Sequence, residues 1–196
     1  MKVFGIGLPR TGTTSLTVAL SQLGYDTWHF PPTLAAGVAA DATCDGLIAA
    51  NWRQLQQNYP DAKYILTLRA LSPWLDSYRA LYDLHYRNIE QQGLTTWLQH
   101  VNAVATQIYG QWQFDPTVWA AKYQTHVAEV QDAFAATPSQ LLTLDIAAGA
   151  GWPQLCGFLG HPQPSLPFPR RNTRAVLGQD WVGFLPGQFD NGASQN

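Results

Sequence analysis

The stretch GIGLPRTGTTSL, residues 5–16, decides the fold and raises the main functional question. The apolar run over residues 2–8 predicts a buried strand, and residues 14–23 carry apolar positions at helical spacing. Gly7 and Gly12 let the backbone turn between these elements, so that N–H groups face inward where the helix starts. A strand, a glycine-containing loop and a helix in this order are typical of phosphate-binding loops. The alternative is an ordinary strand–helix turn, in which the coincidence of glycines, hydroxyls and a cation has no role.

The loop lacks the lysine of loops that hydrolyse ATP. In the pattern G-x-x-x-x-G-K-[ST], a lysine follows the second glycine. Here that position is Thr13, and the cation is Arg10, inside the loop. Arginine differs from lysine in offering a flat, bidentate set of donors. The sequence therefore argues against an ATP-hydrolysing site and leaves open which phosphate-bearing molecule the loop holds.

The composition predicts one folded domain over residues 1–196. Hydrophobic residues make up 46% of the chain, enough for a full core, and the formal net charge is −2. Proteins that bind nucleic acid usually have a basic excess, so we expect no nucleic-acid partner. Cys44 and Cys156 stand in no metal-like spacing and are expected to be reduced thiols. The N-terminus shows no signal peptide or membrane span, which predicts a cytoplasmic protein without a membrane partner.

Strands alternate with helices along the chain. This alternation predicts a three-layer α/β fold, similar to that of P-loop proteins, with a central parallel sheet flanked by helices. Ser72 is expected as the N-cap of one helix and Pro73 as its first residue, and Asp115 and Pro116 repeat this signal. Further strands are predicted at residues 27–30, 63–69 and 140–146, helices at 45–60, 71–90, 95–109, 116–134 and 152–159, and a loop over most of 160–196.

Three segments of the chain resemble a known protein family. LPRTGTTSL, residues 8–16, is similar to the 5′-phosphosulfate loop of sulfotransferases that use 3′-phosphoadenosine-5′-phosphosulfate. With arginine in the loop it is similar to a bacterial and fungal subgroup of sulfotransferase-like proteins. LRALSPWLDSY resembles the family's 3′-phosphate site, with Arg69 at the end of a strand and Ser77 eight positions later. Residues 141–174 resemble the subgroup's C-terminal segment, so the resemblance runs from Phe4 to Asn172.

The resemblance implies transfer of a sulfuryl group from 3′-phosphoadenosine-5′-phosphosulfate to a hydroxyl or amine of a small-molecule acceptor. It implies that no metal is needed, because cations of the protein do the work of one. Arg69 and Ser77 would bind the 3′-phosphate, over which Arg170 and Arg171, together with Arg174, are candidates to close. The alternative for these late arginines is a solvated tail. The residues implied to bind the 5′-phosphosulfate are Pro9, Arg10, Thr11, Gly12, Thr13, Thr14 and Ser15, and Arg10 would also be catalytic.

Asp45 and His29 are candidates for the base that the acceptor needs. His29 ends a predicted strand, Asp45 stands ahead of the helix that leads to residues 63–69, and both are expected near the sheet edge where the loop opens. In chain order, Asp45 stands where cytosolic sulfotransferases carry a catalytic histidine, and His29 where the carbohydrate enzymes carry a catalytic glutamate. The alternatives are that Asp45 is only an N-cap and His29 only a core residue. The two are also candidates for a pair in which the carboxylate orients the imidazole.

Two other functions fit the loop. One is a small nucleotide-dependent kinase of the same fold, against which stand the absent lysine and the absence of an acidic Mg²⁺ ligand after residues 63–69. The other is a nucleotide-binding protein without catalysis. Tryptophans at positions 28, 52 and 74 are candidates for an apolar acceptor pocket. The sequence carries no signal for an oligomeric state.

Overall fold

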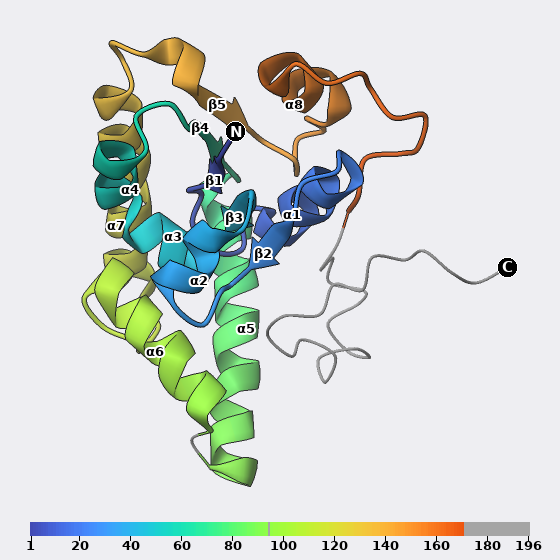
Figure 1. Ribbon diagram of the computed structural model, residues 1–196. Helices are drawn as coiled ribbons and strands as arrows, with labels where there is room; N and C mark the ends of the chain where they lie inside the picture. The colour runs from blue at the N-terminus through green and yellow to red at the C-terminus, as the bar shows by residue number, and fades with distance from the viewer. Residues whose placement is uncertain (94, 171–196) are drawn as a thin grey trace, which may run out of the picture.

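The computed structural model describes residues 1–93 and 95–170, without side chains for residues 85–92. A five-stranded sheet lies at its centre, with the strand order β2-β3-β1-β4-β5 and every neighbouring pair parallel. Helices cover both faces of the sheet (Figure 1), which confirms the predicted three-layer α/β fold. The strands are β1 Val3–Gly5, β2 Thr27–His29, β3 Ala42–Cys44, β4 Lys63–Thr67 and β5 Leu141–Leu144. The helices are α1 Thr13–Gln22, α2 Leu34–Ala39, α3 Gly46–Ala50, α4 Trp52–Asn58, α5 Leu71–Gln92, α6 Thr96–Tyr109, α7 Pro116–Ala133 and α8 Trp152–Leu159, and a 3₁₀ turn covers Pro138–Gln140.

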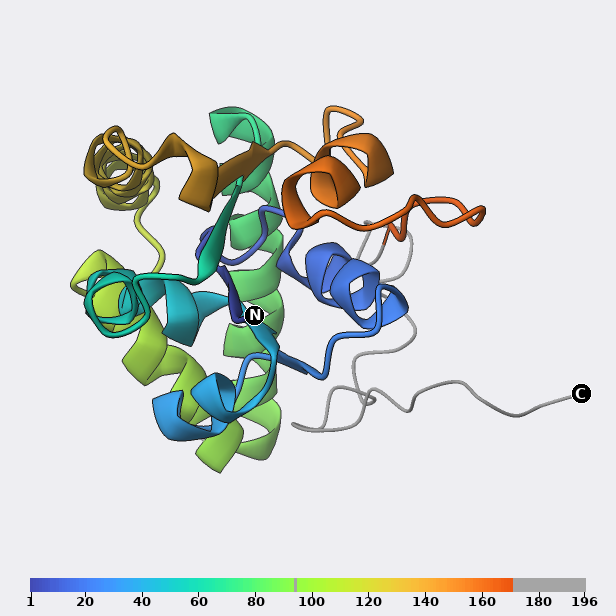
Figure 2. The same cartoon turned by 45° about the horizontal axis from the view of Figure 1, so that its top comes forward.

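Side chains alternate between the two faces of the sheet, so a core forms on each side. Val3 and Ile65 pack with residues of α1 and α8, whereas Phe4 and Tyr64 pack with residues of α3, α4 and α7. Figure 2 shows these two groups of helices on opposite sides of the sheet. A third buried cluster, rich in Trp and Tyr, joins α5, α6 and α7 to Leu8, just beyond β1.

The sheet order places a ligand-binding position at the end of β1. β1 lies between β3 and β4, and the helices that follow β1 and β4, α1 and α5, lie on opposite faces. In open α/β sheets, ligands bind at the carboxyl ends of strands where the connections diverge in this way. The register sets His29 beside Cys44 and Gly5 beside Ile65. The segments that follow these strands therefore meet at one edge.

Two elements between β2 and α3, namely α2 and β3, are not predicted from the sequence. β3 has only three residues, too few to show the alternation that identifies a strand. α2 contains Gly37, a residue that lowers helix propensity. The packing explains this glycine, because a Cβ there would lie 2.9 Å from the ring of Pro31. Both elements depend on tertiary contacts that local sequence does not reveal.

Two predicted helix boundaries are wrong. The helix expected over residues 45–60 is divided at Asn51, whose side chain donates to the carbonyl of Leu47 at 2.7 Å, so that α3 ends and α4 begins. α5 begins at Leu71, and its first turn is already closed by Trp74 N–H donating to Ala70 O. Ser72 therefore lies inside the first turn and is not the N-cap.

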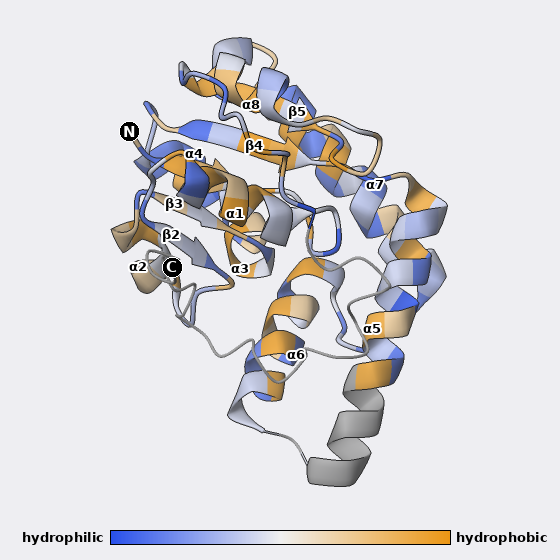
Figure 3. Ribbon diagram, turned by 90° about the vertical axis from the view of Figure 1, so that its right-hand side faces the viewer, coloured by the Kyte–Doolittle hydropathy of each residue, from blue (hydrophilic) through white to orange (hydrophobic). Residues whose placement is uncertain are grey.

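Other predicted boundaries are confirmed. Asp115 caps α7 by accepting from the N–H groups of Thr117 and Val118, and α8 spans the predicted residues 152–159. Within the described part of the tail, residues 160–170 form neither helix nor strand. Figure 3 shows α6 and the coloured part of α5 extending beyond the sheet. Among the described residues, no helix is both long enough and apolar enough to cross a membrane.

Candidate active site

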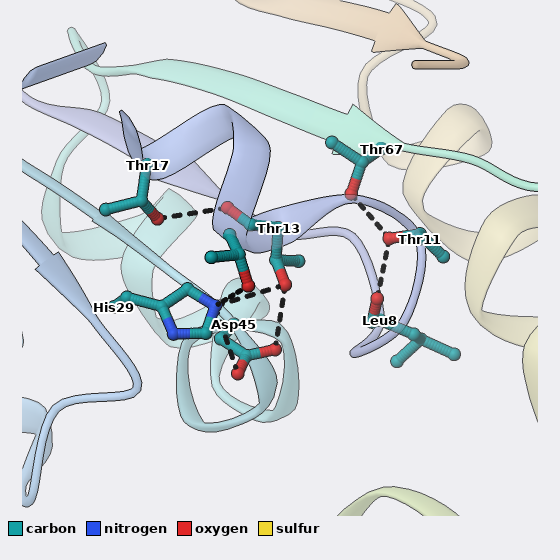
Figure 4. Close-up of polar contacts among 8 residues, drawn as sticks. Leu8, Thr11, Thr13, Thr17, His29, Asp45 and Thr67 are labelled. Atoms are coloured by element: carbon teal, nitrogen blue, oxygen red, sulfur yellow. Dashed lines mark hydrogen bonds and ion pairs between the residues drawn. The ribbon is translucent and has the colours of Figure 1, made fainter. Parts of the chain in front are cut away.

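The loop between β1 and α1 is held by close packing and buried hydroxyls. A Cβ at Gly7 would lie 2.0 Å from Oγ1 of Thr67, so only glycine fits beside the end of β4. The Thr11 hydroxyl donates to Leu8 O at 2.6 Å and lies 2.6 Å from Thr67 Oγ1 (Figure 4). Because the single proton of Thr11 goes to Leu8, Thr67 is the donor in the second bond. These contacts fix the loop against the central strands.

α1 begins at the end of this loop. Gly12 occupies the N-cap position with φ +109° and makes no side-chain cap, and Thr13, Thr14 and Ser15 are buried in the first turn. A helix start without a capping side chain has backbone N–H groups and a partial positive charge directed outward. The arrangement suits a phosphate or sulfate group.

His29 and Asp45 meet beside this helix start. Nε2 of His29 lies 3.5 Å from Oδ2 of Asp45, and the two side chains are only 10% and 11% exposed. The Thr13 hydroxyl donates to Oδ1 of Asp45 at 3.2 Å and lies 3.3 Å from Nε2 of His29. The Thr14 hydroxyl lies 3.2 Å from the same nitrogen. The two candidate bases and the first two residues of α1 thus form one polar cluster.

The cluster differs from a pair in which a carboxylate orients a histidine from behind. In that arrangement the carboxylate holds Nδ1 and leaves Nε2 to the substrate. Here Asp45 and both threonines approach Nε2. Asp45 and His29 therefore face the same point, the start of α1.

Backbone strain concentrates at the same place. Within the described residues, the non-glycine residues with positive φ are Arg10 (72°), Phe30 (53°) and Asp45 (93°). Asp45 has ψ −173°, a combination that is nearly restricted to glycine and costs on the order of 1–3 kcal/mol. Although Asp45 stands at the N-cap position of α3, its side chain makes no capping hydrogen bond. Such strain is typical of functional sites, and the carboxylate is directed to Thr13 and not to its own helix.

Burial shifts the pKa values of His29 and Arg10 in this region. It lowers the pKa of His29 below the ordinary value of 6.5, while Asp45 opposes this shift and Arg10 adds to it. Burial also lowers the pKa of the Arg10 guanidinium; Tyr78 and Asp45 oppose the shift, and Arg69 adds to it. His29 is therefore neutral at neutral pH and able to accept a proton.

Arg10, Arg69 and Ser77 also come together. Nε of Arg10 donates to Oγ of Ser77 at 3.0 Å, and Nη1 of Arg69 donates to the carbonyl of Arg10 at 3.3 Å. Nε of Arg69 is buried and has no hydrogen-bond partner among the described residues. In that part of the chain, neither guanidinium forms a salt bridge with a carboxylate. Two neighbouring, unneutralised cations favour an anion between or beside them.

Other predicted residues lie elsewhere. Trp52 and Trp74 are buried in two different core clusters, so they do not line a common pocket as expected, and Trp28 is half-buried in β2. Arg170 is exposed beyond α8. Arg171 and Arg174 lie outside the described residues.

Trp74 contacts the backbone of the loop and does not line an acceptor pocket. Its indole Nε1 donates to the carbonyl of Pro9 at 2.9 Å, and the hydroxyl of Tyr123 binds the backbone of Arg69. Neither aromatic residue is predicted from the sequence to hold the backbone of the site. The only signal in the sequence is their place on apolar helix faces, which core residues share.

Fold and site together define a parallel α/β protein in which a glycine-containing loop between a strand and a helix lies beside a buried His–Asp pair and two arginines. The family model for the sulfotransferase domain matches residues 2–40 and 34–177, most of the chain, and the chain belongs to this family. The match confirms the family resemblance and supports a transferase that moves sulfuryl groups. No curated protein matches the chain.

Proposed function

We propose that the protein transfers a sulfuryl group from 3′-phosphoadenosine-5′-phosphosulfate to a hydroxyl or amine of a small molecule. The observation that carries the proposal is the contact of Arg10 with Ser77 and Arg69 beside the start of α1. It joins two positions that attract anions, one at a helix N-terminus and one at the end of β4. A nucleotide with two separate phosphate groups matches such a site better than one with a single phosphate chain.

The polar groups present fit this donor. The loop and the first turn of α1, residues 9–15, would hold the 5′-phosphosulfate by N–H groups and hydroxyls. Arg69 and Ser77 would hold the 3′-phosphate, which would give the buried Nε of Arg69 the partner that it lacks among the described residues. Thr13 in place of a lysine leaves less charge for the β- and γ-phosphates of ATP.

The proposed reaction needs stabilisation of negative charge and removal of a proton. When bound, the donor supplies a sulfuryl group whose sulfur exchanges its bond to the 5′-phosphate oxygen for a bond to the acceptor, releasing adenosine 3′,5′-bisphosphate. Arg10 and the hydroxyls of Thr13 and Thr14 would stabilise the charge that grows on the leaving phosphate. Asp45 or neutral His29 would take the proton from the acceptor oxygen or nitrogen.

The shared position of His29 and Asp45 supports this assignment of the base. Both side chains contact Thr13, one of the residues proposed to hold the phosphosulfate. A base at that point is within reach of an acceptor atom that attacks the sulfur. The strained backbone at Asp45 supports a role beyond folding, because strain of this kind persists where function requires it.

Transfer of a labelled sulfuryl group tests the proposal. The protein is incubated with donor labelled at sulfur and with a panel of small hydroxyl and amine compounds. We expect label in at least one acceptor and an equal amount of adenosine 3′,5′-bisphosphate, and we expect Arg69→Ala to lose this product. Arg53→Ala, an exposed arginine paired with Glu129, is the matched control. Phosphoryl transfer from ATP with Mg²⁺, and none from the sulfuryl donor, would instead identify a kinase.

A further inference from the structure

We propose that Trp74 and Tyr123 are positioning residues that set the distance between the loop carrying Arg10 and the strand end carrying Arg69. The inference rests on the proposed function, because it concerns how a ligand with two phosphates is held. Neither side chain is assigned a contact with the ligand. Each acts through a backbone group of a residue next to, or within, one of the two anion-binding positions.

Trp74 holds the loop. It lies in the first turns of α5, its side chain is fully buried, and its Nε1 donates to Pro9 O at 2.9 Å. Pro9 immediately precedes Arg10, whose φ of 72° is unfavourable for a non-glycine residue. The indole therefore holds the loop backbone at the residue before the strained Arg10.

Tyr123 holds the other segment. Its hydroxyl donates to Arg69 O at 2.7 Å and accepts from Arg69 N–H at 3.1 Å. β4 ends at Thr67, so at Arg69 the pairing between strands has ended and both backbone groups need other partners. A single hydroxyl from α7 satisfies them together and fixes the backbone from which the guanidinium extends.

The two aromatic rings are in contact with each other. Their centroids are 4.6 Å apart with an interplanar angle of 42°, within a buried aromatic cluster that also contains Tyr78, Tyr109 and Trp119. Interiors packed in this way deform little. Nη1 of Arg69 returns to the carbonyl of Arg10 at 3.3 Å. The contacts therefore form a closed ring from the loop through both aromatics to Arg69 and back.

A fixed distance matters only to a ligand that uses both positions at once. Once one phosphate is bound, the second contact forms with an effective concentration that depends on correct spacing. If the two segments become mobile relative to each other, binding of the second phosphate must also order them, and the entropy lost lowers the affinity. A ligand with only a 5′-phosphate uses the loop alone and is insensitive to the spacing.

Calorimetric titration of Tyr123→Phe with two ligands tests the inference. The variant keeps the ring and loses the hydroxyl that holds Arg69. We expect the Kd for adenosine 3′,5′-bisphosphate to rise roughly fivefold to thirtyfold, while the Kd for adenosine 5′-monophosphate stays close to that of the wild type. Titration stoichiometry reports the folded fraction, so that partial unfolding is not mistaken for lower affinity.

Tyr64→Phe is the matched control. Its hydroxyl also makes two backbone contacts, to Leu55 O at 2.9 Å and Tyr59 O at 3.1 Å, but it lies among α4 residues away from the loop. We expect the ratio of the two Kd values in this variant to equal that of the wild type. A similar loss of ratio in both variants would mean that general softening of the fold, and not positioning, is the cause.

Trp74→Phe approaches the same ring of contacts from the loop side. It removes the donor to Pro9 and should lower the preference for the bisphosphate as well, and the double variant should lose less than the sum of the two. Unchanged ratios in both single variants would overturn the inference while the proposed function stands. A wild-type protein without any preference for the bisphosphate would overturn the proposed function itself.

Discussion

The hydroxyl of Thr13 donates to Oδ1 of Asp45 at 3.2 Å, from the position where loops that hydrolyse ATP carry lysine. A lysine there would pair with the carboxylate and hold its charge. Threonine orients the same carboxylate without adding a positive charge beside it. The residue that departs from the ATPase pattern is thus in direct contact with the candidate base.

Asp45→Asn should retain binding of adenosine 3′,5′-bisphosphate and lose most turnover. The amide keeps the size of the side chain but does not accept a proton, so we expect kcat to fall on the order of 10²–10⁴-fold. Asp41→Asn is the control, because Asp41 precedes β3 at the opposite end from Asp45 and is exposed. Full turnover in Asp45→Asn, at the same acceptor and pH, would remove Asp45 from the mechanism.

The rate should depend on pH through His29 in a defined direction. Burial lowers the pKa of His29 below 6.5; of the charged groups beside it, Asp45 opposes this shift and Arg10 adds to it. Since the base must be neutral, kcat/KM should be flat around neutral pH and fall only below 6.5. In His29→Gln, this fall of kcat/KM at acidic pH should disappear or shift to another pH. A fall with its midpoint above 6.5, or one unchanged in the variant, would contradict a role for neutral His29.

Arg10 and Arg69 should differ in their effects. Arg69→Ala should raise the Kd for the bisphosphate roughly tenfold to a hundredfold, since it removes a charged donor remote from the sulfur. Arg10→Ala should also lower kcat at saturating donor, because its proposed target gains charge in the transition state. Arg53→Ala should change neither. If Arg10→Ala and Arg69→Ala changed only KM, the assignment of Arg10 to the chemical step would be wrong.

The backbone conformation at Asp45 should lower the free energy of unfolding of the protein. Asp45→Gly and Asp45→Ala both remove the carboxylate, but only glycine relieves the backbone at φ 93°. We expect the glycine variant to have the higher free energy of unfolding, by about 1 kcal/mol. At Asp41, whose φ is not positive, the order should reverse, with alanine the more stable. Urea denaturation of the four variants measures both differences, and the same order at both positions would exclude strain at Asp45.

The sequence predicted those parts of the site that are encoded over short distances. The loop after β1 and the spacing of Arg69 and Ser77 depend on residues within one strand, turn and helix, and the structure brings Ser77 and Arg69 together with Arg10. The parallel sheet followed from the alternation of strands and helices. These features need no knowledge of which distant segments pack together.

The remaining features depend on tertiary structure. β3 is too short to be recognised, yet it sets Asp45 beside β2 and so brings it to His29. That Asp45 and the two threonines at the start of α1 all approach Nε2 of His29 depends on how α1 packs against these strands. The hydrogen bonds of Trp74 and Tyr123 depend on which backbone groups remain unpaired after β1 and β4 end. Their sequence context is that of ordinary core residues.

Calorimetric titration of the wild-type protein with adenosine 3′,5′-bisphosphate and with ATP, each with and without Mg²⁺, tests the central claim most directly. The account predicts that the bisphosphate binds with much the lower Kd and that its binding does not depend on Mg²⁺. ATP as the tighter ligand, with Mg²⁺ required, would contradict 3′-phosphoadenosine-5′-phosphosulfate as the donor.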